Sequence, residues 1–162
     1  MSNSYLSIAK FNAIEIIPNL WLGNQDDALS YFFLHEKNIQ VIINCTPNSP
    51  FIQGEFHIEK KRLNIQNSSS YHDNKKIYEN FDYIVEYIYQ SLNQNRAVLI
   101  HDFDGRQSAP TIIVAYFIHY ARVKVPQAIQ YLKTKDPNTF LPKPNFEYAM
   151  EQYAKDMRKK YS

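Results

Sequence analysis

The stretch from Ala97 to Ala121 constrains the fold more than any other part of the chain. It opens with a short apolar run, Ala97 to Ile100, which is typical of a strand that is covered on both faces. Gly105 supplies a turn, and Ser108 is expected to cap the apolar helix that follows. A strand that leads through a tight loop into a helix presents backbone N–H groups and the positive end of the helix dipole. The stretch therefore predicts a cradle for phosphate or another anion.

Length and composition limit the class of protein. The chain has 162 residues, of which 44% are hydrophobic and 15% aromatic, so one domain with its own core is expected. A net charge of +2 argues against a nucleic-acid or other polyanionic partner. The single cysteine, Cys45, excludes an intramolecular disulfide and a cysteine-rich zinc site, and no metal or cofactor is expected.

The apolar runs also bear on location. None is long enough to cross a bilayer and the chain does not open with a secretory signal, so no membrane association and an intracellular, by default cytoplasmic, location are expected. Asn, Ile, Lys and Tyr are abundant, as in proteins encoded by AT-rich viral or microbial genomes. Residues 1–12 are expected to form an N-terminal lead, and residues 13–160 a single domain.

The N-terminal half predicts alternating strands and helices. Glu15 to Leu22 is expected to form two strands joined by a Pro-Asn turn. A helix capped at Gly23-Asn24 should follow and run to about Lys37. The residues expected along one face of that helix are Ala28, Tyr31, Phe32 and His35. Gln40 to Cys45 predicts another buried strand.

The other predicted elements follow from the same patterns. They are an edge strand at Phe56–Leu63 with Lys60, Lys61 and Arg62 facing water, and helices at Ile77–Leu92, at Val125–Lys135 and from about Phe146 to Lys160. The basic end of the last helix, formed by Lys155, Arg158, Lys159 and Lys160, is expected to be a solvated face, with an electrostatic contact site as the alternative.

The central stretch resembles the signature of the dual-specificity branch of the cysteine-dependent protein phosphatases, which reads His-Cys-x-x-Gly-x-x-Arg-Ser between a strand and a helix. The matching residues are Val98, Leu99, Ile100, His101, Gly105, Thr111, Ala115 and Tyr116. The opening EIIPNLWLGNQDDAL is also similar, and the resemblance covers roughly Ala13 to Tyr153. It implies an α/β fold whose central, mostly parallel sheet is flanked by helices.

The resemblance also implies where the family's chemistry would lie, and there the chain departs from the pattern. Without a gap, the nucleophilic cysteine position is Asp102, the phosphate-binding arginine position is Ser108 and the general-acid position is Asn67. An amide cannot donate the proton that the leaving group needs. Loss of the guanidinium removes a bidentate, charge-assisted grip on phosphate. Asp73, in a serine-rich stretch expected to be a flexible loop, is the alternative acid.

The charges in the loop also argue against phosphate binding. The degenerate phosphate-binding loop comprises His101, Asp102, Phe103, Asp104, Gly105, Arg106, Gln107 and Ser108. Asp104 adds a second negative charge, and Arg106 stands two positions early, where it is expected to lean outward or to pair with Asp104. We therefore hypothesise that the Asp102 carboxylate accepts the loop N–H groups that a phosphate would otherwise take.

Two enzymatic alternatives remain. The string Asp102-Phe-Asp-Gly resembles the start of haloacid-dehalogenase-type phosphatases, in which aspartate is the nucleophile; only about sixty residues follow here, without paired acids. Alternatively, Asp102 forms an acyl-phosphate with help from His101 or Asp73. In the simpler interpretations, His101 is a satisfied core histidine, and Cys45 is a small buried hydrophobe on a strand unsuited to a substitute nucleophile.

The sequence thus predicts a catalytically inactive member of this family, a pseudophosphatase. It is expected to bind a protein partner, a phosphoprotein being one candidate, or to serve as a structural component. The alternative is an active or weakly active tyrosine or serine/threonine phosphatase with an unorthodox site. The oligomeric state is not predicted.

Overall fold

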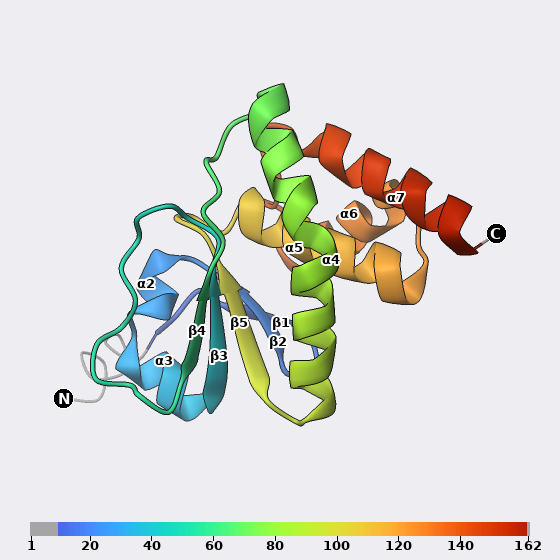
Figure 1. The fold of residues 1–162 in the computed structure, drawn as a ribbon. Helices are drawn as coiled ribbons and strands as arrows, with labels where there is room; N and C mark the ends of the chain where they lie inside the picture. The colour runs from blue at the N-terminus through green and yellow to red at the C-terminus, as the bar shows by residue number, and fades with distance from the viewer. Residues whose placement is uncertain (1–9, 162) are drawn as a thin grey trace.

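A five-stranded sheet with helices on both faces forms the fold (Figure 1). The computed structural model describes residues 10–161, so the predicted lead lies mostly outside the described residues. The strands are β1 (Ile14–Ile17), β2 (Leu20–Gly23), β3 (Ile39–Asn44), β4 (Glu59–Arg62) and β5 (Ala97–His101). Their order is β1-β2-β5-β3-β4, and only the β1–β2 pair is antiparallel. The predicted α/β fold with a mostly parallel central sheet is confirmed.

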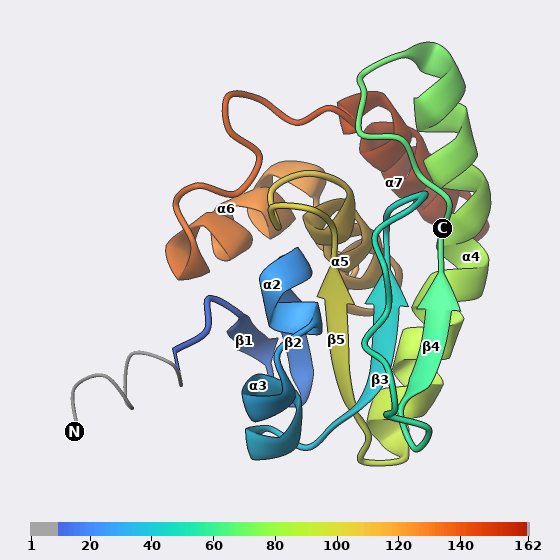
Figure 2. The same ribbon diagram turned by 90° about the vertical axis from the view of Figure 1, so that its left-hand side faces the viewer.

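The helices are divided unequally between the two faces of the sheet (Figures 1 and 2). The short helices α2 (Gln25–Ala28) and α3 (Tyr31–Glu36) cover one face. The other face is covered by α4 (Tyr71–Asn93), α5 (Ser108–Ala121), α6 (Val125–Lys135) and α7 (Glu147–Tyr161). No helix in residues 10–161 is both long enough and apolar enough to cross a membrane.

Strand β5 lies at the centre of the sheet and is buried along its whole length. Successive side chains of a strand point to opposite faces, so β5 contributes to two cores. Val98 and Ile100 belong to the larger cluster, which contains side chains of the four long helices. Leu99 packs in the smaller cluster with Trp21 and Phe33. The predicted doubly covered strand is confirmed.

The strands next to β5 end at the same level as β5. Gly23 at the end of β2 and Asn44 at the end of β3 both pair with His101. The loop between β5 and α5 therefore starts at the carboxyl edge of three adjacent parallel strands, where open α/β sheets commonly bind ligands. Figure 2 shows this loop above the tips of the strands.

The single helix predicted up to Lys37 is wrong, because the chain forms two helices there. Asn24 caps α2 by accepting the N–H of Asp27 at 2.9 Å, and the Ser30 hydroxyl caps α3 by accepting the N–H of Phe33 at 3.1 Å. The restart at Ser30 changes the buried face. Of the four residues expected along one face, Ala28 is buried, whereas Tyr31, Phe32 and His35 are exposed; Phe33 and Leu34 are buried instead.

Helix α4 begins six residues before the predicted Ile77. Ser70 is its N-cap and accepts the N–H of Asp73 at 3.1 Å, so Asp73 lies in the first helical turn and not in a flexible loop. At the sheet edge, β4 is shorter than the strand predicted at 56–63. Helix α6 has the predicted bounds, Val125–Lys135.

Candidate functional site

The loop between β5 and α5 is held close to the sheet by a glycine. Gly105 has φ +79°, and a Cβ atom there would lie 3.1 Å from the carbonyl oxygen of Gly23. A side chain would therefore be strained by the backbone conformation and crowded by the turn after β2. From that turn, the backbone N–H of Gln25 donates to the carbonyl of Phe103 at 3.1 Å. These contacts fix the loop over the edge of the sheet.

The Asp102 carboxylate occupies the inside of this loop. Its oxygens accept the backbone N–H groups of Gly105, of Gln107 at 3.3 Å and of Ala109 at 3.0 Å. The Ser108 hydroxyl also lies 3.3 Å away. The side chain is only 4% exposed, so these partners replace water almost completely. This is the arrangement hypothesised from the sequence.

Two opposing effects act on the charge of Asp102. Burial raises the pKa of this carboxyl above its ordinary value, because the anion loses its hydration. The N–H groups of Ala109, Gly105 and Gln107 oppose that shift, since they stabilise the charged form, and the nearby Asp104 adds to it. An incoming phosphate dianion would meet a carboxylate that is already in contact with the donors it requires.

Ser108, at the arginine position of the family signature, is the first residue of α5 and not its cap. The N-cap is Gln107, and its side chain makes no capping hydrogen bond. The Ser108 hydroxyl lies 3.2 Å from the carbonyl oxygen of Cys45, as well as close to Asp102. The predicted capping role of Ser108 is therefore wrong, because its side chain connects Cys45 and Asp102, the residues that follow β3 and β5.

Gln107 attaches the loop to the segment before α7. Its Nε2 atom donates to the carbonyl oxygens of Leu141 at 3.2 Å and Lys143 at 3.0 Å, and its Oε1 atom accepts the N–H of Asn145 at 2.9 Å. The side chain is buried. All of its polar atoms are used in holding segment 141–145 against the loop, which gives Gln107 a positioning role that the sequence did not reveal.

Asn67, at the general-acid position, and the alternative acid Asp73 are both engaged elsewhere. Asn67 is exposed, and its Oδ1 atom accepts a hydrogen bond from the Asn145 side chain at 2.7 Å. Asp73 accepts hydrogen bonds from the Ser68 and Ser70 hydroxyls. The Ser68 hydrogen bond is the main cause that lowers the pKa of Asp73. A carboxyl whose pKa is lowered is a poor proton donor at neutral pH.

His101 is buried, but only one of its ring nitrogens has a partner. Nδ1 lies 3.2 Å from the carbonyl oxygen of Asp102, and Nε2 has no hydrogen-bond partner among residues 10–161. Burial lowers the pKa of His101 to about 4, so the ring is neutral at physiological pH. The expected core histidine is therefore buried as predicted but only half satisfied.

A cavity of about 190 Å³ adjoins the loop. Its lining residues are Cys45, Thr46, Pro47, Asn48, Ser49, Ile65, Gln66, Asn67, Asp102, Phe103 and Ser108. The set contains no lysine, arginine or histidine and contains one carboxylate. The described part of the chain also holds no group of three or more His, Cys, Asp or Glu side chains suited to a metal ion. A cavity lined in this way lacks a cation for a phosphate group.

Cys45 lies closer to the site than the sequence indicated. It follows β3, which is hydrogen-bonded to β5, so it lines the cavity beside Asp102 and Ser108. Burial and the Asp102 charge raise the pKa of this thiol well above its ordinary value. Because only the thiolate attacks phosphorus, a raised pKa makes Cys45 a poor nucleophile. It is buried, as predicted.

The loop cation points away from the cavity. Arg106 is exposed and does not line the cavity, which agrees with the expected outward position. Its backbone N–H donates to the Asp104 carboxylate at 3.1 Å. Arg62 on β4 is also near the site, but its guanidinium donates to the carbonyls of Thr46 at 3.0 Å and Ser49 at 2.8 Å. Arg62 thus holds two residues of the cavity lining without lining the cavity itself.

Residues 20–156 match the family model described as the dual specificity phosphatase catalytic domain. The chain belongs to this family. It is 31% identical over 138 residues to the human (Homo sapiens) dual specificity protein phosphatase 9, covering 83% of this chain and 34% of the relative. It is 27% identical over 158 residues to the human dual specificity protein phosphatase 16, covering 98% of this chain and 23% of that relative. The chain spans about a third or less of these proteins.

Solved structures show the same fold. A crystal structure of human DUSP28 has a TM-score of 0.80 and 16% identity, covering 90% of this chain and 95% of the other. A human tyrosine phosphatase-like serine/threonine/tyrosine-interacting protein has a TM-score of 0.73 and 20% identity, covering 94% and 99% of the two chains. At these identities the similarity concerns the fold alone.

Proposed function

We propose that this family member is a pseudophosphatase, a dual-specificity phosphatase domain that binds a protein partner, or serves as a structural component, without hydrolysing phosphate esters. The observation that carries the proposal is the placement of the Asp102 carboxylate, which takes three backbone N–H groups of its own loop. In a family that binds a phosphoryl group at this loop, those groups are the donors for the phosphate oxygens.

Charge supports the proposal. An active site of this family combines a nucleophile, a cation and an acid, whereas the matching positions here hold Asp102, Ser108 and Asn67. A nucleophilic thiolate is also negative, so Asp102 alone would not change the sign of the charge that phosphate meets. The absence of a cation from the cavity lining does change the charge that phosphate meets. One charge contact at about 4 Å is worth on the order of 4 kcal/mol near a protein surface.

The enzymatic alternative has less support from the geometry. It would use Asp102 as the nucleophile, with His101 or Asp73 assisting. The Asp102 oxygens are occupied by backbone donors, the His101 ring does not line the cavity, and the Asp73 carboxylate is bound by two serines. Cys45 lines the cavity, but its raised pKa leaves little thiolate at neutral pH.

A fold neighbour fits a binding role by its name. The human structure with a TM-score of 0.73 is described as a phosphatase-like, serine/threonine/tyrosine-interacting protein. By extension, we propose that the present chain interacts with a protein, with a phosphoprotein as one candidate, in an intracellular setting.

Turnover and oxyanion binding by the purified protein test the proposal. The wild type should release no product above the blank from para-nitrophenyl phosphate or from a phosphotyrosine peptide. Inorganic phosphate and vanadate should not raise its melting temperature. The double variant Asp102→Cys with Ser108→Arg should bind vanadate and gain weak activity, because it restores a thiol and a guanidinium at the base of the loop.

Two controls make the assay decisive. Asp102→Asn removes the charge without supplying a nucleophile, and it should stay inactive. Cys45→Ser removes the only thiol of the chain. Wild-type hydrolysis of phosphotyrosine at ordinary enzyme rates, about 1 per second or more, would refute the proposal. Loss of that activity in Cys45→Ser would then identify an unorthodox thiol mechanism.

A further inference from the structure

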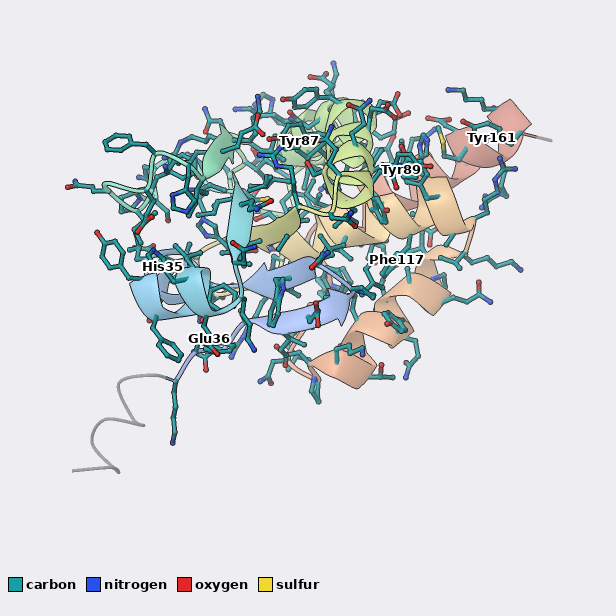
Figure 3. The ribbon with its side chains drawn as sticks, turned by 90° about the horizontal axis from the view of Figure 1, so that it is seen from below. His35, Glu36, Tyr87, Tyr89, Phe117 and Tyr161 are labelled. Carbon is teal, nitrogen blue, oxygen red and sulfur yellow. The ribbon has the colours of Figure 1, made fainter. Side chains whose placement is uncertain are left out.

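A second hollow lies at the opposite end of α5 from the phosphatase loop. This hollow, the α5–α7 groove, encloses about 370 Å³, which is within the rough size range of ligand pockets. Its apolar lining consists of Ile118, Val123, Ala154, Met157 and the Tyr161 ring. Figure 3 shows Tyr161 at the far end of α7, on the opposite side of the molecule from His35. The groove has room for one or two large apolar side chains.

Three cations line the same groove. They are Arg122, Lys124 and Arg158, and no carboxylate joins them in the lining. None of the three forms an ion pair within residues 10–161. Acids on the neighbouring helices are hydrogen-bonded elsewhere: Asp82 to Tyr153 and Asp156 to Tyr78. The groove therefore combines an apolar floor with a positive rim that forms no ion pair within residues 10–161.

Arg122 has an unusual backbone conformation at this rim. It is the C-cap of α5, with φ 57° and ψ 33°, in the left-handed region where glycine is the usual residue. Its guanidinium carbon lies 4.2 Å from the centre of the Tyr161 ring, so the side chain forms part of the groove wall. This contact holds the Arg122 charge at the wall of the groove.

We infer that the α5–α7 groove binds a short acidic segment of a partner protein. The segment inserts one or two apolar side chains over Val123 and Met157 and places carboxylates against Arg122, Lys124 and Arg158. Charge complementarity selects the acidic partner, and the hollow, apolar floor selects a peptide over the headgroup surface of an anionic membrane. This inference rests on the proposed binding role but not on the loss of catalysis.

The groove and the phosphatase loop are separate sites. Helix α5 has 14 residues, and at 1.5 Å per residue its ends lie about 20 Å apart. The loop precedes the first residue of α5, and Arg122 follows the last. A peptide in the groove would therefore leave the cavity beside Asp102 open.

The probe is a fluorescein-labelled peptide of sequence Asp-Glu-Asp-Phe-Leu-Asp-Glu, titrated with the full chain by fluorescence anisotropy. We expect saturable binding that weakens about fivefold when the salt concentration rises from about 50 mM to about 300 mM, because the rim charges are exposed. A peptide with lysines in place of the acids, and one with Gly-Ser in place of Phe-Leu, should each bind at least about tenfold more weakly.

The double variant Arg122→Gly with Lys124→Glu is the principal test in the protein. It should weaken binding of the acidic peptide by about tenfold or more without lowering the melting temperature, since glycine suits the backbone at position 122. Lys155→Glu is the matched control. It lowers the charge by two on α7 outside the groove lining, against three in the double variant, and it should change binding by less than about twofold.

Chemical-shift perturbation in the wild type provides a test that needs no variant. The acidic peptide should shift the amides around Val123 and Ala154 and leave those of residues 102–107 unchanged. The inference is overturned if the acidic peptide does not bind, if the lysine peptide binds equally well, or if shifts appear at the loop. It is also overturned if the chain binds phosphatidylserine vesicles and not the peptide. None of these outcomes affects the proposal that the phosphatase loop is inactive, which the turnover assay tests.

Discussion

The two ends of helix α5 have opposite relations to charge. At the N-terminal end, the backbone donors face inward and the chain's own Asp102 carboxylate satisfies them. At the C-terminal end, Arg122 and Lys124 face a hollow and have no ion-pair partner in the described part of the chain. One end is closed by a side chain of the protein, and the other is open.

The difference indicates where a partner can act. Negative charge is favourable at a helix N-terminus and positive charge at a C-terminus, so both ends hold the charge that suits the dipole. At the loop the charge is buried and bound, which leaves little free energy for a ligand. At the groove the charges are exposed, and a ligand can still neutralise them. The end of α5 that the family uses for chemistry is thus the less available one here.

The largest effect is expected from removing the Asp102 carboxylate at the N-terminal end of α5. Asp102→Ala leaves three buried backbone N–H groups without their acceptor, and it should lower the free energy of unfolding by about 3 kcal/mol in urea titrations. Added phosphate should restore part of the lost stability in this variant and none in the wild type, because an anion can then enter the cradle.

Asp104→Ala is the matched control for that measurement. Asp104 is exposed and accepts one N–H group of the same loop, so its removal should cost less than about 1 kcal/mol. An Asp102→Ala variant as stable as the Asp104→Ala variant would show that the internal carboxylate does not hold the loop together. The contrast between the two ends of α5 would then lose its basis.

The second effect is a pH dependence of the free energy of unfolding, caused by His101 at the same end of α5. In the folded protein, burial lowers the pKa of His101 to about 4, whereas the unfolded ring titrates near its ordinary 6.5. The unfolded state therefore binds more protons between these values, and stability falls as the pH is lowered through this window. Between about pH 7.5 and about pH 5 this single group should cost about 2 kcal/mol.

Thermal or urea unfolding at several pH values measures the effect. His101→Asn should flatten the pH dependence by that amount, because asparagine does not titrate. His119 serves as the control outside the loop. Burial also lowers the pKa of His119, but its ring is hydrogen-bonded to the Tyr153 hydroxyl and not to the loop. If His101→Asn keeps the full pH dependence, the burial of a neutral His101 ring at the base of the loop is not the cause of that dependence.

The smallest effect is expected at Arg122, at the C-terminal end of α5. Arg122→Gly relieves a left-handed backbone conformation but removes the contact with Tyr161, so the free energy of unfolding should rise by no more than about 1 kcal/mol. Asn95→Gly is the control, because Asn95 has φ 59° and asparagine tolerates this region better than arginine. A clear loss of stability in Arg122→Gly would mean that Arg122 is structural, which would remove one support for the groove.

The fold was largely predictable because its main signals are local. The apolar run of β5, the glycine after it and the apolar helix that follows are contiguous in the chain, and the structure places them as predicted. The bounds of α6 were also predictable, because Pro126 suits a first turn and Asp136-Pro137 ends the helix. Such signals do not depend on contacts between distant segments.

The errors fall where a short capping signal competes with hydrophobic periodicity. Ser30 restarts the helix after α2, and Ser70 with Asp73 three residues later begins α4. A serine followed at that spacing by an acid is a known start signal, so the second error was avoidable. The place of Gln107 was not predictable, because its partners lie 34 to 38 residues away.

Cys45 shows the limit of assigning sites by strand. The sequence predicts Cys45 on a strand unsuited to a substitute nucleophile, yet β3 lies next to β5 and ends at the same level. The order of strands in the sheet decides which strand ends meet, and a single sequence does not fix that order. The identities at positions 67, 102 and 108 were readable from the chain, whereas the bonds that Asp102 makes required coordinates.

The common level of the ends of β2, β5 and β3 has a consequence for how this domain changes over evolutionary time. The surface beneath the loop is made by backbone pairing, with Gly23 and Asn44 both opposite His101, and it does not require any particular reactive group above it. Substitutions at the reactive positions can therefore be tolerated where the new side chain satisfies the loop N–H groups, as the Asp102 carboxylate does. A protein lineage can therefore lose phosphate hydrolysis and keep a stable domain that acquires another function.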